Sequence, residues 1–68
     1  MKIYILYNAR FFKIFKADAN NQIIPTYTDT QADAMWYNDK SKDLFESAVR
    51  HICEYEQITP EQLEFINN

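Results

Sequence analysis

Residues 8–16 read NARFFKIFK, a run in which three phenylalanines stand among three basic residues. This composition predicts a β-strand over about residues 10–17, entered from a turn. Side chains on a regular strand alternate between two faces. One face is expected to pack beneath the rest of the protein and holds Phe12 and Ile14. The other face combines rings with a cation: Phe11, Lys13 and Phe15.

Two further strands are expected to flank this one. The apolar N-terminal run predicts a strand over about residues 2–8, and IIPTYT predicts another over about residues 22–28. The connections are short, so the three strands should form an antiparallel meander. Asn8 is the residue of the first turn that is expected to be left-handed. Pro25 has no N–H for a ladder hydrogen bond, which places the third strand at an edge or a bulge.

The second half of the chain changes to a helical period. Apolar residues recur at helical spacing through about residues 42–57, with Asp39 or Ser41 as the N-cap. Residues 29–37 predict a shorter helix, and a strand through residues 34–37 is the alternative.

The segment after residue 58 carries a clear helix-start pattern. Thr59 fits an N-cap, Pro60 the first helical position and Gln62 the partner in a capping box. A terminal helix is therefore expected over about residues 60–66, held to the core by Leu63 and Ile66.

These elements predict one small α+β domain over residues 1–68. A three-stranded antiparallel sheet is followed by two or three helices packed on one face. A chain of this length buries only roughly 60% of its unfolded surface. Most of its five Phe, five Tyr and one Trp are therefore expected in the core.

The composition excludes several kinds of site. The chain has no glycine, so phosphate-binding loops, dinucleotide fingerprints and the nucleophile elbow are excluded. His51, Cys53 and Glu54 stand close in sequence, but His51 and Cys53 would point to different sides of a helix, and a zinc site requires four ligands. No metal, cofactor or catalytic residue is expected, and the protein is predicted not to be an enzyme.

The cellular location follows from the same reading. A single cysteine fits a reducing compartment. No apolar run has the length of a membrane span, and the N-terminus lacks the pattern of a signal peptide. The protein is predicted to be cytoplasmic, with no membrane partner.

Charge divides the chain into two unlike parts. Residues 1–28 carry four basic residues and one acid, whereas residues 29–68 carry three basic residues and nine acids, for a net charge of −3. An acidic helical face is expected to dock on a protein partner with a basic surface. Such surfaces are common on proteins that handle nucleic acid. The residues predicted to bind this partner are Trp36, Tyr37, Asp39, Asp43, Glu46 and Glu54.

In size and in its acidic helical half, rather than in any motif, the chain resembles proteins that mobile elements use against host nucleases, including anti-CRISPR inhibitors. The resemblance implies a small inhibitor or adaptor.

Two alternatives stay open. One is a module that binds RNA or single-stranded DNA on a basic and aromatic sheet face, although the net acidity makes nucleic acid the less favoured partner. Its residues would be Arg10, Phe11, Lys13 and Phe15. The other is a homodimer closed through that aromatic face.

Overall fold

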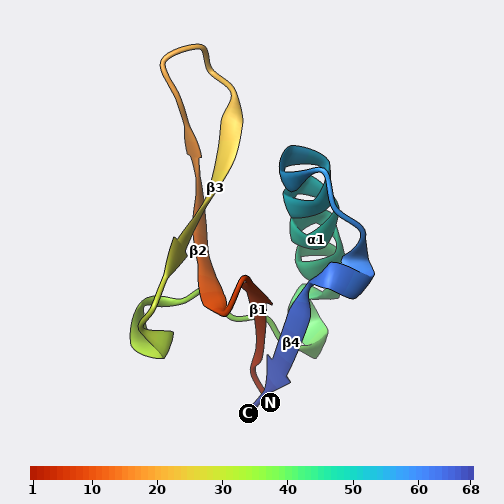
Figure 1. Cartoon of the computed structure of the whole chain (residues 1–68). Helices are drawn as coiled ribbons and strands as arrows, with labels where there is room; N and C mark the ends of the chain where they lie inside the picture. The colour runs from red at the N-terminus through yellow and green to blue at the C-terminus, as the bar shows by residue number, and fades with distance from the viewer.

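The computed structural model describes all 68 residues as a four-stranded antiparallel sheet with one α-helix on one of its faces (Figure 1). The order across the sheet is β3-β2-β1-β4. The strands are β1 (Ile3–Tyr7), β2 (Arg10–Ala17), β3 (Ile23–Thr28) and β4 (Glu64–Asn67). The helix α1 spans Lys42–Glu56, and three short 3-10 turns are η1 (Gln31–Asp33), η2 (Asp39–Ser41) and η3 (Pro60–Gln62).

The α+β class is confirmed, but the prediction of three strands and two or three helices is wrong. Residues 60–66 form a single 3-10 turn and then β4. The capping pattern is real, since the Thr59 N–H donates to the Gln62 side-chain oxygen at 3.1 Å. It supports one turn only, because Leu63 is extended and buried in the core. β4 then pairs with the apolar edge of β1, whose main-chain groups need a partner.

The helix predicted over residues 29–37 is also wrong. Only η1 is helical there, and Ala34 returns to extended backbone. Tyr37 exchanges two main-chain hydrogen bonds with Ile3, at 2.8 and 2.9 Å, and the Met35 N–H donates to the Phe12 carbonyl at 3.1 Å. The segment therefore lies between β1 and β2. It forms a single β-bridge at Tyr37 and not the strand through residues 34–37 that was the alternative prediction.

A β-bulge at Lys13 changes which side chains of β2 face the helix. The register against β3 shifts between Phe12 and Ile14, so that Lys13 is an extra residue. Beyond the bulge Phe15 returns to the side of Phe12, with 4.7 Å between their ring centroids, and Ile14 is 44% exposed. The regular alternation expected for this strand is therefore wrong after residue 12.

β2 pairs with β1 over a short length only. The two strands pair only at Leu6 with Phe11 and at Tyr7 with Arg10, next to the turn. β2 then continues with β3 as a long hairpin that extends beyond the rest of the sheet (Figure 1). The segment through Tyr37 occupies the place beside β1 that β2 has left.

The core lies between the sheet and α1. Six buried side chains form it, and they come from β1, β2, α1, the bridge and the residue before β4: Ile5, Phe12, Tyr37, Ala48, Ile52 and Leu63. None of the helices has the length and apolar character needed to cross a membrane.

Candidate functional site

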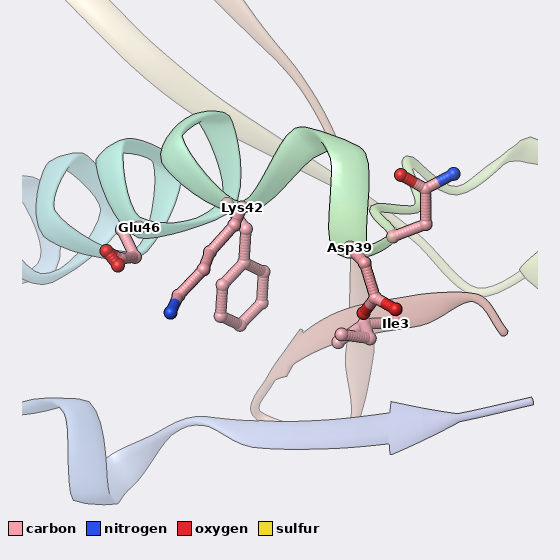
Figure 2. Close-up of a pocket in the computed structure, with 6 residues that line it drawn as sticks. Ile3, Asp39, Lys42 and Glu46 are labelled. Atoms are coloured by element: carbon pink, nitrogen blue, oxygen red, sulfur yellow. The ribbon is translucent and has the colours of Figure 1, made fainter.

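The candidate site is a hollow of about 550 Å³ between the start of α1 and the strand β1 (Figure 2). Charged side chains and an apolar base meet there. Its lining residues are Ile3, Asn38, Asp39, Lys42, Phe45 and Glu46.

A capped turn positions the rim of this hollow. The Asn38 side-chain oxygen accepts a hydrogen bond from the Lys40 N–H at 3.0 Å, and the Asn38 N–H donates to the Ser41 hydroxyl at 2.8 Å. These bonds hold η2 directly against the first turn of α1. Asp39 from η2 and Glu46 from α1 are consequently presented on the same side of the fold.

Aromatic packing forms the base. The Phe45 ring makes edge contacts with Tyr37, at 5.7 Å between centroids, and with Phe65 of β4, at 5.5 Å. Ile3 is held beside it by its hydrogen bonds to Tyr37. The hollow thus has a rigid apolar floor beneath a charged rim.

Neither carboxylate of the rim takes part in an ion pair. The chain contains one ion pair, between Arg10 of β2 and Asp29 just after β3 at 3.0 Å, and neither residue lines the hollow. Glu46 makes no ion pair with Arg50, although their spacing on the helix favours one. Lys42 lines the same hollow and offsets one of the two carboxylates, so Asp39 and Glu46 together leave an excess of one negative charge there.

The fold separates the residues predicted to bind a protein partner. Asp39, Asp43, Glu46 and Glu54 are all exposed, but Glu54 belongs to a second hollow near the end of α1. Asp39 and Glu46 share the candidate site.

The two aromatic residues of that set have different surroundings. Tyr37 is 7% exposed and belongs to the core, where burial raises its pKa. Trp36 is 44% exposed, and the Lys2 ammonium lies 4.9 Å from its ring centroid. Because Ile3 points to the helix side, Lys2 and Trp36 lie on the opposite face of the sheet. Neither ring reaches the hollow.

The residues of the nucleic-acid alternative do not form one surface. Arg10 is paired with Asp29. Phe11 packs edge-on against Tyr4 at 5.8 Å, whereas Phe15 packs against His51 at 5.6 Å on the helix side. Lys13 is exposed in the bulge.

The base of the hollow was not identified from the sequence. Ile3, Phe45 and Phe65 all look like ordinary core positions in the sequence pattern. The alternation of β1 puts Ile3 on the same face as the core residue Ile5. Phe65 lies in the segment that the capping pattern predicts to be helical, so strand alternation gives no expectation for it.

Cys53 on α1 is the single free cysteine and is partly buried. Burial, with a smaller effect of the Glu61 charge, raises the pKa of the Cys53 thiol, which makes the reactive thiolate scarcer. No three side chains of the metal-binding types lie together.

No family model, no curated protein and no solved structure matches the chain.

Proposed function

We propose that the protein is a non-enzymatic binder that docks the acidic side of α1 on a basic surface of another protein. A protein that handles nucleic acid, such as a nuclease, is the proposed partner, because phosphate binding demands basic surfaces. The protein would then act as an inhibitor or adaptor of the kind that mobile elements direct against host defence, anti-CRISPR inhibitors included.

The observation that carries the proposal is the pair of exposed carboxylates that line the hollow together with the single cation Lys42. Asp39 and Glu46 are exposed and without ion pairs, above a floor made by Ile3 and Phe45. An arginine side chain suits this arrangement, because its stem is apolar and its guanidinium binds carboxylates and aromatic rings. Lysine would fit with fewer directed hydrogen bonds.

Docking of this kind would inhibit the partner by occupying its nucleic-acid-binding surface. The acidic side chains would stand where the phosphates of a nucleic acid otherwise bind. Complementary charge would also speed the encounter of the two proteins, and added salt would slow it.

The test begins with affinity purification of the partner from the native host. The Asp39→Asn, Glu46→Gln double variant is then compared with wild type for binding to the isolated partner. Rim charge pairs typically affect the rate of association and its salt dependence, so both should fall in the variant.

A matched control removes the same charge elsewhere. Asp33→Asn with Glu61→Gln changes two exposed acids outside the hollow. Equal loss of binding in both double variants would show that the net charge of the protein, and not the hollow, determines binding. Unchanged binding in the Asp39, Glu46 variant would refute the proposal, as would purified protein that shifts RNA or single-stranded DNA in a salt-sensitive manner without any protein partner.

A further inference from the structure

The sheet has two edges, and they differ in their capacity to accept another strand. β3 carries Pro25 in its middle, which lacks an N–H and discourages strand addition. β4 has no proline and no lysine along Glu64–Asn67. Its residues Glu64, Phe65 and Asn67 are exposed, so the helix does not cover this edge.

The hydrogen bonds between β4 and β1 determine which groups of β4 stay free. Lys2 and Asn68 exchange two main-chain hydrogen bonds, at 2.7 and 2.8 Å. Hydrogen-bonded pairs alternate with non-bonded pairs in an antiparallel ladder. Ile66 and Glu64 therefore also bond toward β1, whereas the N–H and C=O groups of Phe65 and Asn67 point away from the sheet.

These free groups are self-complementary. We propose that β4 pairs in antiparallel fashion with β4 of a second copy of the chain, about a two-fold axis at Ile66. Phe65 of each copy then stands opposite Asn67 of the other, and both pairs exchange two hydrogen bonds. All four outward main-chain groups are satisfied at once, and Ile66 faces its own counterpart at the closer, non-bonded spacing.

The side chains are compatible with this register. Glu64 lies opposite Asn68 of the second copy, so no like charges are directly opposed. The result is a continuous eight-stranded sheet with the order β3-β2-β1-β4-β4-β1-β2-β3. The two-fold axis is perpendicular to the sheet. Both α1 helices therefore lie on the same face of the sheet, and the two acidic hollows face the same way.

The dimer and the proposed docking respond differently to salt. Each copy carries a net charge of −3, so screening of their repulsion should strengthen dimerisation. Screening weakens the attraction between an acidic hollow and a basic partner. The dimer does not depend on the proposed function, and one can fail while the other stands.

Analytical ultracentrifugation of the purified protein tests the dimer. The expected mass is twice 8.2 kDa at high protein concentration, and the dimer fraction should rise with salt. Asn67→Pro removes an outward N–H without removing a bond to β1, and should restore the monomer with an unchanged circular dichroism spectrum. Asn67→Ala is the matched control, since it keeps the N–H and should stay dimeric.

Nuclear magnetic resonance provides a measurement that needs no variant. In a mixture of isotope-labelled and unlabelled chains, an intermolecular contact is expected between the Ile66 α-protons of the two copies. The amides of Phe65 and Asn67 should exchange slowly with solvent at high concentration and quickly on dilution. A monomer at millimolar concentration, or a dimer without this contact, would overturn the proposal.

Discussion

The hydroxyl of Tyr27 on β3 donates a 2.7 Å hydrogen bond to the carboxylate of Glu56, the last residue of α1. Both side chains are partly buried, and the bond ties the helix to the base of the long β2–β3 hairpin. The hairpin extends past the rest of the sheet (Figure 1).

Replacement of Tyr27 by Phe should therefore destabilise the protein. A hydrogen bond to a charged group contributes about 1.5–3 kcal/mol, and the free energy of unfolding should fall by an amount in or just below this range. Urea denaturation measures the change. Tyr55→Phe is the control, because Tyr55 is 43% exposed and its hydroxyl makes no hydrogen bond; equal effects of the two changes would contradict the assigned bond.

Alkaline pH should destabilise the protein through two tyrosines. Burial, together with the Glu56 hydrogen bond in the case of Tyr27, raises the pKa of Tyr27 and Tyr37 above the ordinary value of 10.0. Both are neutral in the folded state where the unfolded chain would ionise. Their contribution to stability is complete below pH 10 and is lost as the pH rises above it, at up to about 1.4 kcal/mol per pH unit for each tyrosine.

Urea midpoints measured at several pH values on both sides of that pKa check this expectation. Tyr27→Phe should make the decline shallower, since one of the two titrating groups is gone. Stability that stays level through the alkaline range would show that neither hydroxyl is held neutral by the fold.

The β1–β2 turn offers a stabilising substitution. Asn8 and Ala9 have φ values of 52° and 64°, the left-handed conformation that two-residue hairpin turns require. Alanine pays a steric cost there that glycine avoids. Ala9→Gly should raise the free energy of unfolding by about 0.5–1 kcal/mol.

The matched substitution lies in the next hairpin turn. Ala19 has a negative φ, so Ala19→Gly only adds freedom to the unfolded chain and should be neutral or destabilising. Thermal unfolding of both variants separates the two cases. A lower melting temperature for Ala9→Gly would argue against the left-handed turn.

Because of the bulge at Lys13, truncation of Phe15 should cost much more stability than truncation of the neighbouring Ile14. Phe15 packs against Phe12 and His51 beneath the helix, so Phe15→Ala should cost about 2–4 kcal/mol. Ile14 is 44% exposed on the other side, and Ile14→Ala should cost less than about 1 kcal/mol. Urea denaturation of both variants gives the ranking, and a regular strand would reverse it.

Local patterns predicted much of this fold. The first three strands, the main helix and the left-handed Asn8 follow from side-chain alternation, helical spacing and turn chemistry. Pro25 correctly placed the third strand at an edge. Leu63 is buried in the core as expected, whereas Ile66 is only partly buried and lies opposite Tyr4 in the sheet.

The errors arise where distant segments decide the local structure. Residues 64–67 have no strong strand signal, and they extend because β1 offers an unpaired edge. Tyr37 is extended because β2 leaves a gap beside Ile3. The Lys13 bulge has no mark in the sequence, and it was enough to move Phe15 and Ile14 to unexpected faces.

The same distant pairing places a condition on the speed of folding. Ile3 and Asn67 are partners in the sheet, and 63 residues of the chain lie between them. The entropy of closing so long a loop must be overcome before this contact gains anything in return. The β1–β2 turn and the β2–β3 hairpin are local and should form early. β1 then lacks its second neighbouring strand until β4 pairs with it. The pairing of β4 with β1 is therefore the step that should limit the folding rate.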